Sequence, residues 1–390
     1  MGDRARLCRG AAAMTVRATT RGAQRASLDG TRADVLICGA SFAGLAAARE
    51  LAGSGATVLV LDRYEIGERQ TSACACPRPW MEYMGVESSI RQELPFMRFA
   101  TPHGSVRYRL PWSWAAFDYR DLCDRLWEQC ADARFETAVV EGLGGCDEAG
   151  DLVVQTDRGL VRAPLVLDAL GWKRVLGSAR HQPPEAPLTR ALEVHPPHDG
   201  SGDALEVWVE RETVRRGYAW RVPAGGEARI GVASYEPRDH VRDPVVEHVT
   251  QLGGTAVGFQ GNWVPHRLRP AAEDDVFFAG DSAGHCFPLS AEGIRTAFYF
   301  GLVAGRAMRE VLGGSATRAQ ALRGYAAFSD RHGRAFGLAA RLQQLIPALP
   351  PRLLTAVLRV IGVQPLVDRS FGWYLRQAHP DGLPQQVSRQ

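Results

Sequence analysis

Lysine is almost absent from this chain of 390 residues, because Lys173 is the only lysine among 46 basic residues. Long hydrophobic runs are missing too, since no stretch approaches the roughly 18 consecutive apolar residues that a membrane-spanning helix needs. The eight cysteines include no CxxC pair, and Cys74 and Cys76 stand too close together for ordinary zinc-site spacing. These absences argue against an integral membrane protein and a disulfide-stapled miniprotein, and they predict no bound metal.

Charge is unevenly placed along the sequence. The formal net charge is +3, yet residues 1–33 hold seven arginines against two aspartates, and residues 303–390 hold twelve arginines against four acidic residues. The centre is therefore acidic, unlike a nucleic-acid-binding domain, which carries a basic stripe on its folded part. We expect no nucleic-acid partner. The basic C-terminal end fits either a solvated helical surface or contact with anionic lipid.

The composition is that of a globular protein, with 45% hydrophobic and 23% charged residues, and the length suffices for two domains. Residues 1–33 lack the apolar core of a secretory signal, and their low hydrophobicity predicts a disordered basic tail. The irregular cysteines predict a reduced, cytoplasmic protein.

A βαβ unit is predicted directly after this tail. Short apolar runs at 34–38 and 57–62 are typical of buried parallel strands. Residues 43–53 between them are typical of the connecting helix. The loop at 39–44 is a variant of the GxGxxG fingerprint with Ser41 in place of the middle glycine. Asp62 closes the second strand, where a carboxylate can accept hydrogen bonds from ribose hydroxyls. The predicted dinucleotide-binding residues are Gly39, Ser41, Phe42, Ala43, Gly44, Asp62 and Arg63.

A second strand–turn–helix segment indicates that the dinucleotide is a flavin. Residues 276–279 read as a buried strand, Gly280-Asp281 follows, and Glu292-Gly293-Ile294 begins a long helix. The Asp281 carboxylate is placed to accept from a ribityl hydroxyl, and the helix start directs N–H groups at the flavin edge that becomes anionic on reduction. We predict FAD as the cofactor, bound here by Gly280, Asp281, Pro288, Glu292, Gly293 and Ile294.

Short β-like runs between 189 and 234 predict an antiparallel sheet, which is a different architecture and so a second domain. The predicted fold class is α/β. A Rossmann-like FAD-binding domain (34–178 and 266–312) is interrupted by an antiparallel-sheet substrate domain (179–265). A helical C-terminal region (313–390) follows.

These motifs resemble those of the geranylgeranyl reductase family of FAD-dependent oxidoreductases, within the class shared with aromatic hydroxylases and flavin-dependent halogenases. The resemblance covers residues 34–312 and rests also on residues 74–77, 118–122, 167–171 and 218–223. It implies that Arg120 reaches the FAD diphosphate region and that Cys74 faces the isoalloxazine and the substrate. It also implies that the element at 218–223 lines a lipid-binding cavity beside the flavin.

Two departures separate the chain from the other members of that class. Hydroxylases carry an Asp-Gly motif that contacts FAD and NADPH, whereas Asp168 is followed here by Ala169. The resemblance still places Asp168 among the predicted cofactor-binding residues. Halogenases need a lysine between flavin and substrate, and Lys173 lies beside a different strand. Two prolines in the loop after Cys74 indicate a reshaped substrate pocket.

The resemblance implies hydride transfer from flavin N5 to a C=C bond of an isoprenoid, of the geranylgeranyl or polyprenyl/menaquinone type. The second carbon then needs a proton donor, and the candidates are Cys74, Cys76, Tyr218 and a bound water. A thiol of ordinary pKa is mostly protonated at neutral pH, but buried cysteines are equally often packing residues. Trp220, Pro223 and His285 are the predicted substrate-binding residues.

Two other functions remain open: a flavin-dependent monooxygenase (hydroxylase or epoxidase) on a secondary metabolite, and a non-catalytic flavin- or lipid-binding protein. The sequence has no second glycine fingerprint for an NADPH domain, so we expect transient NADPH or reduced ferredoxin as the electron donor. The apolar stripe at 353–361, flanked by Arg352 and Arg359, either caps the flavin domain or contacts a membrane surface. The expected partners are therefore a prenyl-lipid or other small-molecule substrate, an electron-donor protein and a peripheral membrane contact.

Overall fold

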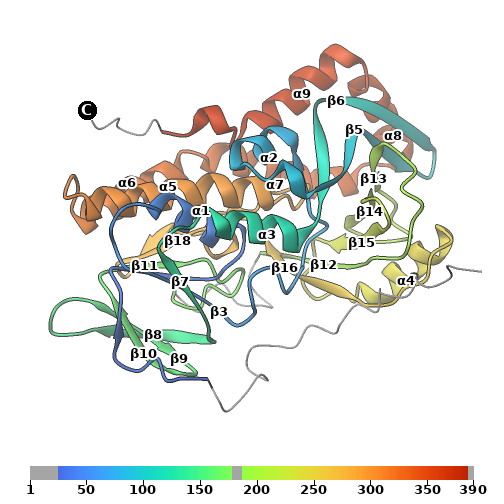
Figure 1. The fold of residues 1–390 in the computed structure, drawn as a ribbon. Helices are drawn as coiled ribbons and strands as arrows, with labels where there is room; N and C mark the ends of the chain where they lie inside the picture. Colours follow the sequence, from blue (N-terminus) through green and yellow to red (C-terminus); the bar gives the residue numbers. More distant parts are fainter. Residues whose placement is uncertain (1–24, 178–186, 385–390) are drawn as a thin grey trace, which may run out of the picture.

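The computed structural model describes residues 25–177 and 187–384 (Figure 1). One half is built on a six-stranded sheet of order β17-β18-β11-β2-β3-β7. Its strands are β2 (Val35–Cys38), β3 (Val58–Asp62), β7 (Ala133–Thr137), β11 (Leu165–Asp168), β17 (Ala272–Glu273) and β18 (Val276–Phe278). All neighbours pair in parallel except β17 and β18. The predicted Rossmann-like sheet is confirmed.

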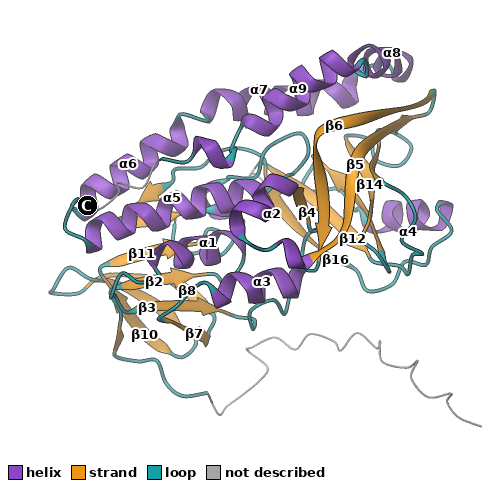
Figure 2. Ribbon diagram, turned by 45° about the horizontal axis from the view of Figure 1, so that its top comes forward, coloured by secondary structure: helices purple, strands orange, loops and turns teal. Residues whose placement is uncertain are grey.

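Helices cover one face of this sheet, and a smaller sheet lies on the other side (Figures 1 and 2). The helices are α1 (Phe42–Leu51), α3 (Tyr119–Glu128), α5 (Ile294–Leu312) and α6 (Arg318–Asp330). Helices α1 and α5 touch backbone to backbone, since a Cβ added to Gly301 would lie 2.4 Å from the Ala43 carbonyl oxygen. This close packing ties the starts of both helices to one place.

The smaller sheet has the order β1-β10-β9-β8. Its strands are β1 (Thr31–Arg32), β8 (Val140–Cys146), β9 (Leu152–Thr156) and β10 (Gly159–Ala163). Leu28 is buried in the core, and Arg25 donates a hydrogen bond of 2.7 Å to the Thr137 carbonyl. The prediction of a disordered tail over 1–33 is therefore wrong for residues 25–33. Leu28 packs against apolar residues of the core, and β1 pairs with β10. The earlier part of that tail lies outside the described residues.

The other half is an eight-stranded sheet of order β16-β12-β15-β14-β13-β5-β6-β4. Its strands are β4 (Ala75–Pro77), β5 (Ile90–Thr101), β6 (Gly104–Phe117), β12 (Leu188–Val194), β13 (Ala204–Trp208), β14 (Gly217–Pro223), β15 (Ala228–Ser234) and β16 (Gln260–Pro265). Every neighbouring pair is antiparallel except β13 and β5. The predicted antiparallel sheet is confirmed, but β4, β5 and β6 were expected in the FAD-binding domain. They join this sheet because β5 pairs with β13, a contact between distant residues that no local pattern encodes.

One face of the large sheet packs against α4 (Arg242–Gln251), and the opposite face lies toward the C-terminal helices (Figure 2). These helices are α7 (Gly333–Leu345), α8 (Pro351–Ile361) and α9 (Gln364–Arg376), and the predicted helical C-terminal region is confirmed. Tyr108 on β6 donates a hydrogen bond of 2.6 Å to the Leu358 carbonyl and so fastens α8 to the hairpin of β5 and β6. The remaining short elements are α2 (Arg78–Met84), η2 (Glu87–Ser89), η4 (Gly280–Ala283), η5 (Ile346–Ala348) and η6 (Pro380–Gly382).

Across residues 25–177 and 187–384, no helix has the length and apolar character that crossing a membrane would require.

Candidate functional site

A cavity of about 1100 Å³ lies between the two large sheets and beneath the C-terminal helices. The loops that follow β2, β11 and β18 line its one end, together with the last residue of β3. These are the carboxyl ends of parallel strands, where open α/β sheets bind ligands. The cavity is large enough for a dinucleotide and a second molecule, because ordinary small-molecule pockets measure roughly 300–1,000 Å³.

The loop from β2 into α1 leaves no room for side chains at its two glycines. Gly39 has a φ of 111°, and a Cβ there would lie 2.3 Å from the Ala169 carbonyl oxygen. A Cβ on Gly44 would lie 1.8 Å from the Gly39 carbonyl oxygen. Ser41 is the N-cap of α1, and its side chain makes no capping hydrogen bond, so the first N–H groups of the helix stay available to an anion.

Three predicted residues of this loop line the cavity, namely Ser41, Phe42 and Ala43, and so does Asp62 at the end of β3. The Ser41 hydroxyl accepts a hydrogen bond of 3.2 Å from the Tyr119 hydroxyl, which leaves its own hydrogen free to donate. Asp62 accepts hydrogen bonds from the backbone N–H of Ala40 at 2.8 Å and of Tyr64 at 3.0 Å. These bonds fix the carboxylate at the cavity edge, although burial raises its pKa.

The second motif reaches the same cavity from β18. Burial raises the pKa of Asp281 to about 6, and Arg269 opposes this shift. Gly293 is the N-cap of α5, and no side chain of the described residues caps this helix end. Glu292 accepts hydrogen bonds from Arg295 at 2.7 Å and from the Tyr374 hydroxyl at 2.6 Å, so α9 holds the start of α5 in place. The cavity-lining residues of this motif are Gly280, Asp281, Glu292, Gly293 and Ile294.

The donor set fits FAD. Two helix starts with uncapped N–H groups suit the negative diphosphate and the flavin edge, and the carboxylates of Asp62 and Asp281 suit ribose and ribityl hydroxyls. Arg63 lines the same wall and adds a positive charge.

Three predicted cofactor residues lie elsewhere. Asp168 is fully buried and accepts hydrogen bonds from the Ser282 hydroxyl at 2.6 Å and from backbone N–H groups of Leu170 and Leu176, both at 2.9 Å. Its oxygens are therefore used to shape the loop after β11. Pro288 is buried away from the cavity lining. Arg120 is exposed at a separate surface hollow that also holds Asp118, Asp121 and Asp124.

The two predicted catalytic cysteines differ in placement. Cys74 lines the cavity in a left-handed backbone conformation, with a φ of 48°. Burial raises its pKa well above the ordinary value, with Arg229 opposing the shift, so that its thiol holds its proton. Cys76 is buried in the main core and does not line the cavity. The placement supports a role in chemistry for Cys74 and a packing role for Cys76.

Tyr218 and Trp220 line the cavity side by side, with ring centroids 5.9 Å apart. The Tyr218 hydroxyl donates a hydrogen bond of 2.6 Å to the Ser290 carbonyl, so its proton points at the flavin-motif loop. The Trp220 indole Nε1 is buried and has no hydrogen-bond partner among the described residues. Such an atom is expected where a ligand completes the site.

The other two predicted substrate residues belong to the core. The His285 ring stacks on Phe300 at a centroid distance of 3.7 Å, and its Nε2 lies 3.0 Å from the Ser329 hydroxyl. Burial lowers its pKa well below the ordinary value and keeps the ring neutral. Pro223 is buried at the end of β14 and does not line the cavity.

Sequence reasoning missed three charged residues of the site. Lys173, expected beside a different strand, lines the cavity, so its position no longer argues against a halogenase. Glu193 also lines the cavity, and Arg229 is buried beneath the Cys74 loop. Strand alternation was the signal that could have found Glu193, because it places Glu193 on the same face of β12 as Ala191. That signal does not say which face is covered.

Comparisons with known proteins agree with this geometry. No family model matches the sequence. The chain is 25% identical over 357 residues to digeranylgeranylglycerophospholipid reductase 2 of Methanopyrus kandleri, covering 83% of this chain and 89% of that protein. It is also 25% identical over 408 residues to the menaquinone reductase of Mycolicibacterium smegmatis, covering 90% and 97%.

Solved structures show the same fold at lower identity. A geranylgeranyl bacteriochlorophyll reductase-like protein from Thermoplasma acidophilum superposes with a TM-score of 0.77 at 17% identity, covering 90% of this chain and 97% of that one. PqsL, a probable FAD-dependent monooxygenase from Pseudomonas aeruginosa, gives 0.65 at 17% identity, covering 84% and 100%.

The fold and the site together define an FAD-dependent oxidoreductase. Within that class the chain is similar to geranylgeranyl reductase-like proteins, as the motifs led us to expect.

Proposed function

We propose that the chain reduces C=C bonds of an isoprenoid substrate, of the geranylgeranyl or polyprenyl/menaquinone type. The observation that carries this proposal is the apolar extension of the cavity beyond the flavin motifs. Alternate residues of β5 and β13 point into it, as do the inward residues of α8. The apolar lining comprises Met97, Phe99, Leu205, Val207, Val209, Leu354, Val357, Leu358 and Ile361.

This lining suits a hydrocarbon chain better than a polar metabolite. Burial of a methylene group is worth about 0.8 kcal/mol, so several isoprene units supply most of the binding free energy without hydrogen bonds. The apolar stripe of α8 thus faces the cavity, which explains why the helix is amphipathic. The relatives' names point to the same substrate class.

FAD supplies the hydride when it is bound and reduced. The chain's own residues must exclude water, orient the alkene and hold one proton near it. Cys74 is the proposed proton holder, because its buried thiol stays protonated and lines the cavity. The Tyr218 hydroxyl donates its hydrogen bond to the Ser290 carbonyl, and Trp220 forms the cavity wall beside Tyr218.

The electron donor is proposed to be NADPH or reduced ferredoxin, and the substrate is proposed to arrive from a membrane surface. Residues 331–367 hold five arginines and no acidic residue. Large apolar side chains are exposed on α7 and α8 or directly after α8, namely Leu338, Leu345, Leu353, Val360 and Val363. Apolar groups beside arginines favour peripheral contact with anionic lipid.

The test is a single turnover without oxygen. The purified yellow protein is reduced anaerobically and mixed with a geranylgeranyl lipid or a menaquinone. Flavin reoxidation with a product heavier by two hydrogens is the expected result. Reoxidation only after air is admitted, with a product heavier by one oxygen, would instead identify the monooxygenase that the PqsL-like fold allows. No reaction under either condition would indicate a flavin- or lipid-binding protein without turnover.

A further inference from the structure

Strand β12 places a charged side chain in the lining of the cavity. Glu193 on β12 is 2% exposed and lines the cavity. Glu193 Oε1 lies 3.1 Å from His195 Nε2 and accepts a hydrogen bond of 3.3 Å from Gln260 Nε2. Glu193 Oε2 is buried and has no hydrogen-bond partner in the described part of the chain. A half-satisfied buried carboxyl group costs stability, so its presence calls for a reason.

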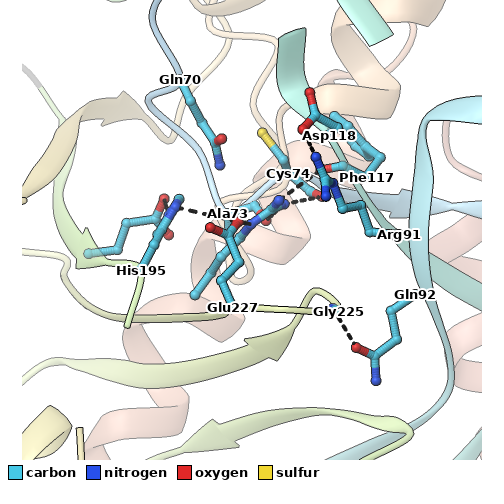
Figure 3. Close-up of polar contacts among 12 residues, drawn as sticks. Gln70, Ala73, Cys74, Arg91, Gln92, Phe117, Asp118, His195, Gly225 and Glu227 are labelled. Carbon is cyan, nitrogen blue, oxygen red and sulfur yellow. Dashed lines mark hydrogen bonds and ion pairs between the residues drawn. The ribbon is translucent and has the colours of Figure 1, made fainter. Parts of the chain in front are cut away.

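The same carboxyl group is connected to solvent. His195 Nδ1 lies 3.7 Å from Glu227 Oε1, and the Glu227 side chain is 36% exposed. Glu193, His195 and Glu227 therefore follow one another from the cavity floor to the surface. Figure 3 shows His195 pointing toward Glu227. A histidine ring between two carboxyl groups can pass a proton, since each ring nitrogen binds one.

This chain of groups also adjoins the Cys74 loop. Arg229 donates hydrogen bonds to Glu227 at 2.9 Å and to the carbonyls of Ala73 at 2.8 Å and Cys74 at 2.9 Å. Burial raises the pKa of Cys74, Arg229 lowers it, and Glu193 and Glu227 raise it further. Cys74 and Glu193 thus line one cavity, and Arg229 joins the Cys74 loop to Glu227.

We propose that Glu193, His195 and Glu227 form a proton relay from solvent to the cavity floor beside Cys74. The inference rests on the proposed function, because each reduced C=C bond takes up one hydride and one proton. The π bond breaks, the hydride brings both electrons and forms one C–H bond, and the Cys74 proton forms the other. Glu193 and Cys74 line the same cavity, so Glu193 then returns a proton to the thiolate through water in the cavity, His195 reprotonates Glu193, and solvent reprotonates His195 through Glu227.

Glu193→Gln tests the relay, because glutamine keeps the shape of the side chain but cannot pass the proton. His195→Gln interrupts the next step, and Glu212→Gln, at an exposed position of the same half, is the matched control. We expect Glu193→Gln and His195→Gln to slow anaerobic single turnover by about 10²-fold or more while the control stays at the wild-type rate. Glu193→Ala should regain rate in acetate, which a purely structural role would not produce.

A second readout is independent of turnover. Alkylation of the Cys74 peptide by iodoacetamide, followed by mass spectrometry over a pH series, should show a lower thiol pKa in Glu193→Gln than in the control. Wild-type rates in Glu193→Gln and His195→Gln, without acetate rescue of Glu193→Ala, would overturn the relay and leave the proposed function intact. A wild-type protein that converts no prenyl alkene would overturn both.

Discussion

Replacing Arg229 by methionine should destabilise the protein and loosen the Cys74 loop. The guanidinium group is buried and bonds to four oxygens, those of Glu227, Ala73, Cys74 and Phe117, at 2.8–2.9 Å. Methionine can fill the space of the side-chain stem but offers no donor. The carbonyls of Ala73, Cys74 and Phe117 and the half-exposed Glu227 carboxylate would then lose this donor, although the Cys74 carbonyl keeps a hydrogen bond of 3.0 Å from the Phe117 N–H (Figure 3).

The expected loss can be estimated from these contacts. A hydrogen bond to a charged group contributes about 1.5–3 kcal/mol, and such bonds from one group are not additive. Removal of one partner of a buried charge pair costs about 3–5 kcal/mol. Because Glu227 is partly exposed and can regain water, we expect a loss of about 3 kcal/mol in the free energy of unfolding, with most of it from the carbonyls that lose the guanidinium donor.

The assay compares Arg229→Met with Arg91→Met in urea unfolding followed by tryptophan fluorescence. Arg91 pairs with Asp118 near the same loop, but its side chain is 52% exposed, so its loss should cost under about 1 kcal/mol. Equal losses of unfolding free energy in the two variants would refute the idea that hydrogen bonds from a buried guanidinium group stabilise the protein more than those from an exposed one. Arg229→Met should also slow single turnover, because Cys74 would no longer be held in its left-handed conformation.

Three further predictions concern the cavity. Gly44→Val should abolish flavin retention, read from the absorbance of the purified protein, because even a Cβ meets the Gly39 carbonyl oxygen; an intact yellow protein would contradict it. Cys74→Ser should lower the single-turnover rate by tenfold or more, whereas Cys76→Ser should keep the rate and lower only the melting temperature; the reverse pattern would exchange their roles. Burial raises the pKa of Asp281 from 3.8 to about 6, so the folded flavin-free protein holds this proton more tightly than the unfolded chain, and stability should fall as pH rises from about 4 to 6. Asp281→Asn should flatten that decline in thermal unfolding, and an unchanged slope would disprove the assignment.

The flavin end of the cavity could be predicted from sequence because its determinants are local. Gly39, Gly44 and Gly293 stand at strand–turn–helix junctions, where backbone geometry restricts the residue type, and Asp62 and Asp281 follow buried strands. Asp168 shows the limit of the same reasoning. It also ends a buried strand, but the Ser282 hydroxyl and two backbone N–H groups use its oxygens.

The substrate end could not be predicted because its determinants are distant contacts. Glu193 and Arg229 alternate with apolar residues, as solvent-facing residues of a half-buried strand do. Only the covering of that face by the Cys74 loop and the C-terminal helices makes them interior. Leu28 was missed for a related reason, since one apolar residue in a polar tail gives no periodic signal.

The parallel pairing of β5 with β13 has a consequence for how the chain is made. A ribosome completes β5 long before β13, since Phe96 must pair with Ala204. Until then the growing chain carries an open strand edge with apolar side chains such as Met97 and Phe99, the kind of edge that recruits other chains. The substrate end of the cavity thus stays open at this strand edge until β13 has been made. Nascent chains that stop before residue 204 should be the ones that most need a chaperone.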